Sequence, residues 1–412
     1  MGRSGKKGIS VGTVLALALS ASVLVCMLVI FSTLGGELDL TRLSVSTGEE
    51  TSSGVQPVQS AAPMQTLAAA VTTASPDMPT GSLTITAGGS FCLESGVRKS
   101  GYYSDVKAYD FTDILSLVSG NLRGDLSLVT LENLVDESAR VSDLIAPQAV
   151  LPALKDAGLT GVSLGFSKAL DKGSATLDGT VSAAQRAGLQ VWGAYASETP
   201  RLMTVNGVRI ALLAYTDTVS SSGAKKRKAD TSGLLLPSTD RAAQDIADAR
   251  AAGAQAVIVS VFWGGSGKSA VTGTQRSTAQ ALAQAGADVI LGTGTRTVQP
   301  ACWLEGEDGH STLCFYSLGT LVSDDRSNSQ VAGVLAQLTL QAEPDGGVAI
   351  SEIACTPTYV WRYKQDGTYR YRVVASSQDA PAGMESSQQD AMRRALSTTQ
   401  TALGTEVDLK WQ

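Results

Sequence analysis

One local pattern constrains the fold of this chain more than any other. Four times, a helix-like segment ends at an Ala-Gly pair and is followed by a short apolar segment, at 157–158, 187–188, 252–253 and 285–286. Glycine commonly ends a helix, and a short apolar run of β-branched residues suits a strand that is buried on both faces. Repeated helix–strand units predict an α/β fold with parallel strands flanked by helices.

The clearest of these units covers residues 254–300. It reads as a strand at Ala256–Val261, a helix at Thr272–Gln284 and a second strand at Asp288–Leu291. Each strand runs into a glycine-rich loop, the first at 263–267 and the second at 292–296. Loops at the carboxyl ends of neighbouring parallel strands are where α/β proteins normally build a site. We therefore expect the functional site at these two loops.

The sheet is predicted to be mixed. Leu202–Val205 and Val208–Tyr215 flank Asn206-Gly207, a strong β-hairpin signal. The other elements expected before residue 254 are strands at 83–87, 126–131, 161–164 and 189–192 and helices at 110–119, 147–157, 174–187 and 239–252. After residue 300 we expect antiparallel strands at 298–304, 312–317, 331–341, 347–355, 359–363 and 369–374, then a terminal helix at 384–403.

The N-terminus carries a membrane signal. A basic tail, residues 1–8, precedes an uncharged and mostly apolar run at 9–34, and about 20 apolar residues cross a bilayer. The basic flank predicts a cytoplasmic N-terminus and an uncleaved signal anchor, with a cleaved signal peptide as the alternative. Residues 35–81 resemble a flexible Ser/Thr/Ala/Pro-rich linker. We expect an extracellular domain at 82–375, a linker and helix at 376–412, and a single-pass protein of the cell membrane.

The charge balance and the scarcity of histidine limit the possible chemistry. There are 32 basic and 38 acidic residues, for a net charge of −6, which argues against a nucleic-acid partner. The chain contains one histidine, His310. Because histidine is the commonest metal ligand and general base, this composition disfavours metal chemistry, and we assign no role to His310.

Four cysteines follow the apolar run, namely Cys92, Cys302, Cys314 and Cys355. An even number of cysteines in an oxidising compartment favours disulfides, and four allow three pairings. Cys302 and Cys314 flank a turn-rich stretch between two strand-like runs, so a hairpin would place them opposite each other. We expect a Cys302–Cys314 disulfide and leave the pairing of Cys92 with Cys355 open. The alternative is four buried thiols.

Several short motifs occur in the order and spacing of a known family. They are Leu131-Glu132, Ala157-Gly158, Asp171-x-Gly173, Trp263-Gly264, Ala285-Gly286-Ala287-Asp288, Gln299-Pro300 and Tyr316-Ser317-Leu318-Gly319. From about Leu83 to Val374, the chain resembles the CapA-type capsule-synthesis family, which is also linked to poly-γ-glutamate assembly. The resemblance implies a fold like that of calcineurin-like metallophosphoesterases, a two-layer sandwich of mixed sheets flanked by helices.

The chain departs from the family where metal ligands are expected. In the first half of the domain, the family's Gly-Asp is replaced by Gly89-Ser90, its Asn-Leu-Glu by Thr130-Leu131-Glu132, and its Asn-Asn-His by Phe166-Ser167-Lys168. In the second half, His-Trp-Gly-x-Glu is replaced by residues 262–266, Gly-His-His-Pro-His by residues 292–296, and a final Asn by Thr320. A two-metal site needs carboxylate, amide and imidazole ligands, and hydroxyl or phenyl groups are poor substitutes. Lys168 and Arg296 also place positive charge where the resemblance implies a metal ion. We expect a degenerate member with no metal and no cofactor.

The candidate ligand-binding residues are Ser90, Glu132, Lys168, Trp263, Thr293 and Arg296. Lys168 and Arg296 could bind a carboxylate or phosphate together with loop amides. Alternatively, these cations are solvated, or they pair with Glu132 and Asp171 and neutralise an abandoned site. Glu132 is also a weak candidate for a general acid or base, although an isolated carboxylate is more often structural. Trp263 has the alternative of being a packed aromatic residue.

These observations predict a membrane-anchored extracellular pseudoenzyme that binds or scaffolds in the assembly of capsule or another surface polymer. The expected partners are the membrane through the N-terminal helix, an anionic surface polymer and capsule-synthesis membrane proteins. A basic run at 225–228 could also contact an anionic polymer or lipid headgroups, or it is a solvated loop. The alternatives are an active CapA-family enzyme with a metal-free or relocated site, and a structural envelope protein.

Overall fold

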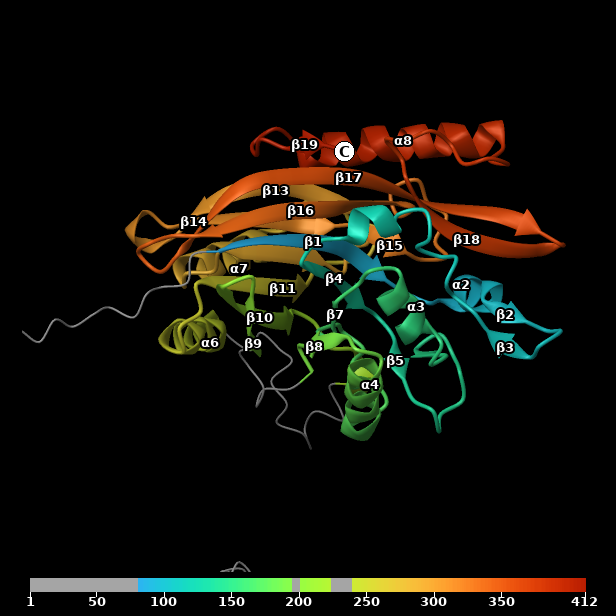
Figure 1. Ribbon diagram of the computed structural model, residues 1–412, viewed down its shortest axis with the longest axis horizontal. Coiled ribbons are helices and arrows are strands. Elements are labelled where there is room, and N and C mark those ends of the chain that lie inside the picture. Colours follow the sequence, from blue (N-terminus) through green and yellow to red (C-terminus); the bar gives the residue numbers. More distant parts are fainter. Residues whose placement is uncertain (1–80, 195–200, 224–238) are drawn as a thin grey trace, which may run out of the picture. The chain divides into compact units, whose positions relative to one another are not determined.

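Two mixed β-sheets pack face to face in the computed structural model (Figure 1), which describes residues 81–194, 201–223 and 239–412. The larger sheet has nine strands in the order β18-β17-β16-β1-β4-β7-β8, with β15 beside β1 and β19 beside β17. Its strands are β1 (Ser82–Phe91), β4 (Leu126–Leu131), β7 (Gly161–Ser163), β8 (Gln190–Trp192), β15 (Thr320–Val322), β16 (Ala332–Ala342), β17 (Val348–Gln365), β18 (Thr368–Ala375) and β19 (Lys410–Trp411).

The smaller sheet has six strands in the order β13-β14-β12-β11-β10-β9. They are β9 (Arg201–Val205), β10 (Val208–Thr216), β11 (Ala256–Phe262), β12 (Val289–Thr293), β13 (Val298–Glu305) and β14 (Ser311–Leu318). A core cluster that includes Ile85, Leu128, Ile258 and Leu338 draws side chains from both sheets, so the sheets bury their inner faces against each other. The mixed-sheet sandwich expected from the sequence is therefore present.

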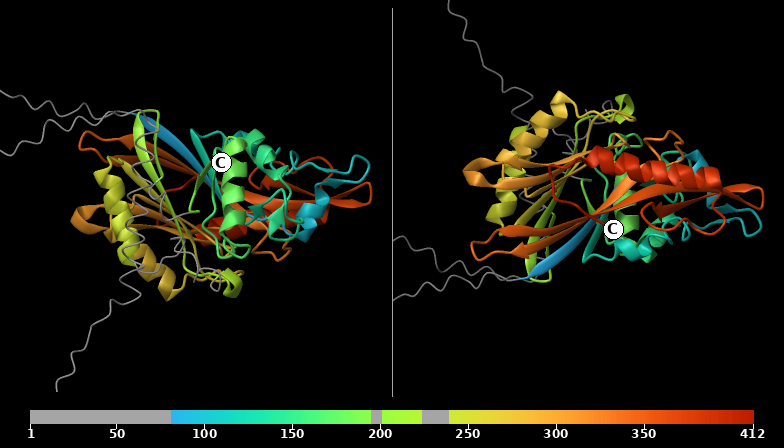
Figure 2. Two further views of the ribbon diagram at one scale, coloured as in Figure 1. Left: turned by 90° about the horizontal axis from the view of Figure 1, so that it is seen from below. Right: turned by 90° about the horizontal axis from the view of Figure 1, so that it is seen from above.

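Helices cover the outer faces of the sandwich (Figures 1 and 2). They are α2 (Ser95–Ser100), α3 (Val150–Asp156), α4 (Ser174–Arg186), α6 (Thr239–Ala251), α7 (Gly273–Gln284) and α8 (Ser386–Leu403), with short 3₁₀ helices η2 (Ser119–Leu122) and η3 (Glu307–Gly309). Two small ribbons complete the fold, β2 (Tyr102–Tyr103) with β3 (Ala108–Tyr109), and β5 (Leu134–Val135) with β6 (Ile145–Ala146).

The parallel strands and the Asn-Gly hairpin follow the sequence prediction. β10, β11 and β12 are neighbours and parallel. β9 pairs antiparallel with β10 through the turn at Asn206 and Gly207, whose φ angles of 49° and 81° are the positive values that a two-residue type I′ turn requires.

One predicted element was wrong, and two predicted strands are joined. The helix expected at 110–119 is a series of turns leading into η2. Asp110 Oδ1 accepts hydrogen bonds from both the amide (2.9 Å) and the hydroxyl (2.8 Å) of Thr112, and such local bonds compete with a helix. The strands expected at 347–355 and 359–363 are one continuous strand, β17. It tolerates Pro357, which has no N–H to donate, at the point where β18 ends beside it.

The C-terminal segment is part of the domain. α8 begins with a capping box between Glu385 and Gln388 and packs Met392 and Ala395 into a cluster with Trp361. Beyond it, β19 adds in parallel to β17. The helix expected at 384–403 is therefore confirmed, and it is docked on the larger sheet.

The predicted N-terminal elements lie outside the described residues. These are the tail at 1–8, the membrane span at 9–34 and all of the linker at 35–81 except Gly81, and they stay predictions, as does any role for 225–228. Among the helices that the structure does describe, none is long and apolar enough to cross a bilayer.

Candidate functional site

A cavity of about 560 Å³ opens at the carboxyl ends of parallel strands from both sheets. Its walls come chiefly from the segments after β1, β4, β7, β10, β11, β12 and β15, and its lining includes Cys92, Glu94, Glu132, Phe166, Lys168, Thr218, Phe262, Gly264, Gly294, Arg296 and Asp324. The two glycine-rich loops at 263–267 and 292–296 both contribute to it. We call this cavity the strand-end pocket.

Arg296 is the central side chain of the strand-end pocket. Its Nη1 lies 2.6 Å from Glu94 Oε1, and its Nη2 lies 2.7 Å from Glu132 Oε2. The same Nη2 lies 3.3 Å from Cys92 Sγ. One guanidinium therefore joins the loops after β1 and β4 to the loop after β12. The Arg296 side chain is 17% exposed and that of Glu132 is 6% exposed, so the ion pair between them is largely shielded from water.

The backbone holds Arg296 in position. Arg296 has a φ of 57°, which is uncommon for a residue with a side chain, and its carbonyl accepts a hydrogen bond from Thr320 Oγ1 at 2.9 Å. Gly294, with a φ of 97°, allows close packing, because a Cβ there would lie 2.8 Å from the Trp263 carbonyl oxygen. The glycine-rich loop thus aims the guanidinium at the carboxylates.

The charged groups around Arg296 shift one another's pKa values. Burial alone would lower the pKa of Arg296, but the carboxylate of Glu132 raises it, and the guanidinium stays protonated. Burial tends to raise the pKa of Glu94, yet the charge and hydrogen bond of Arg296 bring it below its usual value. Burial, assisted by Glu132, raises the pKa of the Cys92 thiol well above its ordinary range. The site therefore contains a fixed cation, ionised Glu94 and a protonated thiol.

These residues do not fit the metal pair that the family resemblance implies. Arg296 occupies the hydrogen-bonding positions of two carboxylates that could otherwise act as ligands, and a protonated thiol is a poor ligand. Across the described ranges, no group of three or more His, Cys, Asp or Glu side chains is arranged to hold a metal ion. The donor set is that of an ion-pair network in which one guanidinium bridges two carboxylates.

The structure separates the six predicted binding residues into two groups. Glu132, Lys168 and Arg296 line the strand-end pocket. Lys168 is exposed, and no carboxylate of the described residues lies within ion-pair distance of its ammonium group. It is therefore available to a ligand at the mouth of the pocket.

Ser90, Trp263 and Thr293 do not line the strand-end pocket, and all three side chains are buried. Ser90 is 0% exposed, Trp263 1% and Thr293 2%. Thr293 Oγ1 donates to Thr130 Oγ1 across the two sheets at 3.3 Å, because its side chain faces the interior of the sandwich. Trp263 Nε1 donates to the Tyr316 carbonyl at 2.7 Å. Trp263 is thus a packed aromatic residue, as the alternative interpretation held.

Sequence reasoning missed Glu94 and misassigned Asp171. Arg296 pairs with Glu132, as one alternative predicted, but its other partner is Glu94, and the Asp171 carboxylate instead accepts a hydrogen bond from the Ser220 hydroxyl. Glu94 lies just beyond the carboxyl end of β1. Because β1 and β4 are parallel neighbours, a correct strand order would have placed Glu94 near Glu132, which follows β4.

The expected Cys302–Cys314 disulfide is also corrected. The two residues face each other in register across β13 and β14, as the hairpin argument required. All four described cysteines are nevertheless free and buried. The Cys314 thiol hydrogen-bonds to Cys302, and this bond lowers the pKa of Cys302. Cys92 is engaged by Arg296, and Cys355 lies in the core between the sheets. The alternative of four buried thiols is what the structure contains.

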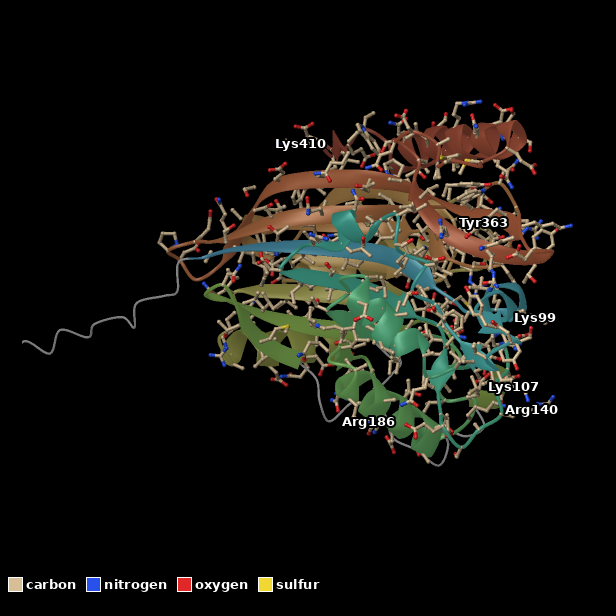
Figure 3. The ribbon with its side chains drawn as sticks, turned by 45° about the vertical axis from the view of Figure 1, so that its right-hand side comes forward. Lys99, Lys107, Arg140, Arg186, Tyr363 and Lys410 are labelled. Carbon is tan, nitrogen blue, oxygen red and sulfur yellow. The ribbon has the colours of Figure 1, made fainter. Side chains whose placement is uncertain are left out.

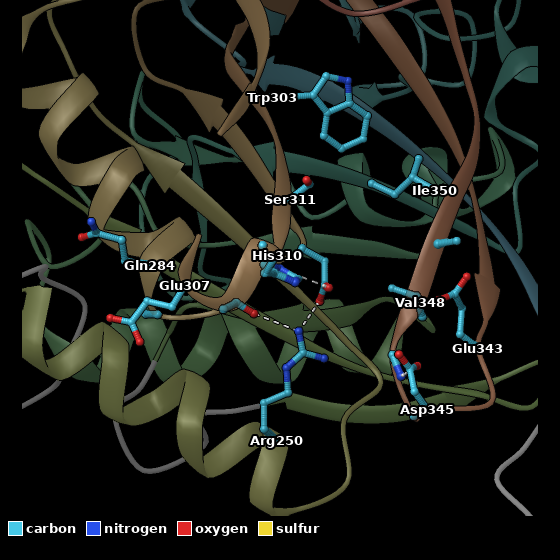
Figure 4. Close-up of a pocket in the computed structure, with 17 residues that line it drawn as sticks. Arg250, Gln284, Trp303, Glu307, His310, Ser311, Glu343, Asp345, Val348 and Ile350 are labelled. Carbon is cyan, nitrogen blue, oxygen red and sulfur yellow. Dashed lines mark hydrogen bonds and ion pairs between the residues drawn. The ribbon is translucent and has the colours of Figure 1, made fainter. Parts of the chain in front are cut away.

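A larger cavity of about 820 Å³ lies near the amino end of β12 (Figure 4). Arg250 Nη2 pairs with Asp288 Oδ2 at 2.6 Å and donates to the Gly286 carbonyl at 2.8 Å. His310 Nε2 lies 2.9 Å from the Ala287 carbonyl oxygen, so it donates there. The Val257 amide also donates to Asp288. Because these polar groups satisfy one another, we interpret the cluster as structural.

Comparison with known proteins identifies the family. The family model described as bacterial capsule synthesis protein PGA_cap matches residues 84–325, more than half of the chain. The chain belongs to this family. It is 28% identical over 245 residues to the capsule biosynthesis protein CapA of Bacillus anthracis, covering 57% of this chain and 56% of that protein. It is 27% identical over 241 residues to the PGA biosynthesis protein CapA of Bacillus subtilis (strain 168), covering 57% and 60%.

The alignments span little more than half the length of these two relatives. Among solved structures, the NAD nucleotidase NadN of Haemophilus influenzae is similar with a TM-score of 0.40 and 12% identity, over 81% of this chain and 64% of that chain. This likeness concerns the general fold, and no residue role is transferred from it.

Proposed function

We propose that this chain is a binding component of capsule or poly-γ-glutamate assembly that holds an anionic polymer segment without hydrolysing it through metal ions. Membership of the PGA_cap family and the two CapA relatives support the biological setting. The observation that carries the binding role is the bridge from Arg296 to Glu94 and Glu132. A cation supplied by the protein takes the place of a catalytic metal and leaves a pocket open above it.

The ligand contact is assigned to the Lys168 side of the strand-end pocket. The guanidinium of Arg296 is already engaged by two carboxylates and a thiol, whereas Lys168 is exposed at the rim. A polymer carboxylate would pair with Lys168 and with nearby hydroxyls such as those of Thr218 and Ser266. Glu94 and Asp324 would repel a second carboxylate but would accept amide N–H groups. A polyamide with spaced carboxylates has both kinds of group.

The setting at the cell surface is part of the proposal. The run at 9–34 would anchor the chain in the membrane, and the sandwich would lie on the outer side. In this setting the membrane and the capsule-synthesis membrane proteins are its partners, and the pocket acts on polymer close to where it is made.

Binding of poly-γ-glutamate to the purified full-length chain tests this function. The change is Lys168→Glu, which should weaken binding by about tenfold or more because a charge-assisted contact is replaced by repulsion. The control is Lys172→Glu, an exposed lysine of the same loop that does not line the pocket. Fluorescence anisotropy of labelled polymer gives the dissociation constants.

Three results would contradict the proposal. Absence of binding to poly-γ-glutamate, teichoic acid and anionic glycans would favour a structural envelope protein. Polymer turnover that Glu132→Gln abolishes would favour an active enzyme. Stoichiometric manganese, iron or zinc in the active full-length chain would contradict the metal-free assignment.

A further inference from the structure

Two hairpins lie side by side at one end of the larger sheet, the β2–β3 ribbon and the β17–β18 hairpin (Figures 1 and 2). Direct contacts join them. The Arg370 guanidinium stacks on the Tyr103 ring at 4.1 Å from its centroid and hydrogen-bonds the Ser100 carbonyl. We call residues 99–109 and 361–372 together the hairpin end.

The hairpin end concentrates exposed apolar side chains. Of the six large apolar or aromatic side chains that are exposed in the described part of the chain, three lie here. Val106 is 68% exposed in the β2–β3 turn, Tyr369 is 47% exposed on β18, and Tyr102 is 40% exposed on β2. Such side chains usually have a partner when they gather on one surface.

The same end carries cations without counter-ions. Lys99, Lys107, Arg362 and Lys364 have no carboxylate of the described residues within ion-pair distance. Arg362 and Lys364 both lie over the Tyr369 ring, at 4.5 and 5.3 Å from its centroid. Figure 3 shows Lys99 and Lys107 on this side of the molecule.

Acidic groups do not offset this charge. The two turns contribute Asp105 and Asp366, and Asp113 beside them is paired with Arg372 at 2.8 Å. The hairpin end is therefore positively charged in a chain whose net charge is −6.

We propose that the hairpin end docks on the headgroups of an anionic phospholipid bilayer. Tyrosine rings suit the membrane–water interface, and long basic side chains are attracted to anionic lipids. Val106, at the tip of a protruding turn, would reach the boundary with the acyl chains. A soluble polyanion would satisfy the cations but offers no apolar phase for Val106 and Tyr369, so the lipid surface is the better fit.

Docking would also orient the strand-end pocket. α2 begins at Ser95, which lines that pocket, and Lys99 lies in its last turn. Since α2 is a single short helix, the pocket opens close to the docked surface. The charge and the exposed side chains of the hairpin end do not depend on what the strand-end pocket binds.

The test uses the full-length chain with Cys26→Ser and a fluorophore on Val106→Cys, because the described native cysteines are buried. The chain is mixed with vesicles of phosphatidylcholine alone or with phosphatidylglycerol, each carrying a nitroxide-labelled lipid that quenches the dye. We expect quenching at residue 106 that depends on phosphatidylglycerol. A dye on Asp345→Cys, in the turn at the opposite end of β17, should stay unquenched.

Charge reversals make the assignment specific. Arg362→Glu with Lys364→Glu should lower the phosphatidylglycerol-dependent quenching at residue 106, corresponding to a docking equilibrium at least about 25-fold weaker, since each basic residue contributes roughly fivefold. Lys99→Glu with Lys107→Glu, on the other hairpin, should have a similar effect. Because this variant leaves β17 unchanged, a loss of docking in it cannot be attributed to misfolding of that strand. The matched control is Arg393→Glu with Arg394→Glu on α8, which carries the same charge change on two exposed residues.

Equal quenching at residues 106 and 345, quenching that ignores lipid charge, or insensitivity to both reversals would overturn the proposal. A response of the dye to soluble polyglutamate but not to anionic vesicles would also overturn it, and would assign the surface to a polymer.

Discussion

Two arginine–carboxylate pairs flank β12, one near each end of the strand. Arg250 pairs with Asp288 near the amino end at 2.6 Å, and Arg296 pairs with Glu132 near the carboxyl end at 2.7 Å. The carboxylate side chains are equally buried, at 6% exposed. The pairs differ in the remaining hydrogen-bonding capacity of their members. Asp288 also accepts the Val257 amide, whereas Glu132 Oε1 is buried and has no hydrogen-bond partner among the described residues.

This difference separates a structural pair from a site. Arg250 donates to Asp288 and to three carbonyls, those of Ala254, Gln255 and Gly286, so it ties loops together. Arg296 joins acidic groups from different loops beneath an open pocket. A buried polar atom left without a partner has a cost in stability, and such costs are often retained at functional sites. We therefore place function at the carboxyl end of β12.

The largest expected effect is that of Arg296→Ala. It would leave Glu94 and Glu132 without their shared cation, and removal of one member of a buried pair typically costs about 3–5 kcal/mol. We expect a loss of that order in the free energy of unfolding, measured by urea denaturation. The control is Arg186→Ala, whose pair with Glu137 has side chains 60% and 59% exposed and should change stability by about 0–1 kcal/mol. Equal losses in the two variants would contradict the central role of Arg296.

The second prediction compares Asp288→Asn with Glu132→Gln. Arg250 and the Val257 amide both donate to Asp288 Oδ2, so an Asn carbonyl oxygen could accept both, but Asn removes the carboxylate charge that pairs with Arg250, at about 2–3 kcal/mol. Gln at 132 keeps one acceptor for Arg296, and its amide group replaces the unpartnered Oε1, so the loss should be about 1 kcal/mol. Urea denaturation of both variants measures the difference. The reverse order would break the distinction between structural pair and site.

The sequence predicted the architecture through features that act locally. The Ala-Gly helix ends gave the alternation of helices and strands, and Asn206-Gly207 gave the antiparallel edge hairpin, because positive φ angles at two successive positions are costly for most other residues. The helix predicted at 110–119 was wrong because local hydrogen bonds compete with helical ones, and the hydrophobic pattern does not show them. Here the Thr112 amide and hydroxyl donate to Asp110.

The site was harder to predict, because its residues meet through topology. Arg296 and Glu132 are 164 positions apart and Arg296 and Glu94 are 202 apart, so no spacing rule connects them. The loss of the family's ligands was visible in the sequence, but the partner of Arg296 was not. Successive side chains of a strand point to opposite faces of the sheet. A shift of one residue in register therefore decides whether Ser90 and Thr293 face the pocket or the interior of the sandwich.

The third prediction concerns pH. Arg296 lowers the pKa of Glu94 in the folded chain, so Glu94 contributes stability above its unfolded pKa of about 4.3, and this stability is lost as pH falls through the lower folded value. Glu94→Gln should therefore destabilise by about 1 kcal/mol near pH 7 and by progressively less below pH 4.3. Urea midpoints measured from neutral to acidic pH test this. A difference that does not change with pH would show that Glu94 acts only by packing.

The smallest expected effect is at the structural end of β12. His310 Nε2 donates to the Ala287 carbonyl at 2.9 Å, but Thr312 Oγ1 donates to the same oxygen at 2.6 Å. His310→Ala should therefore cost only about 0.5–1 kcal/mol, because the carbonyl keeps one donor. Thr312→Val should be similarly mild, whereas the double variant leaves the carbonyl without both donors and should lose more than the sum of the two single losses. Urea denaturation of the four proteins gives the coupling energy. Strict additivity would mean that the two donors act independently, and the network at this end would then be looser than the one around Arg296.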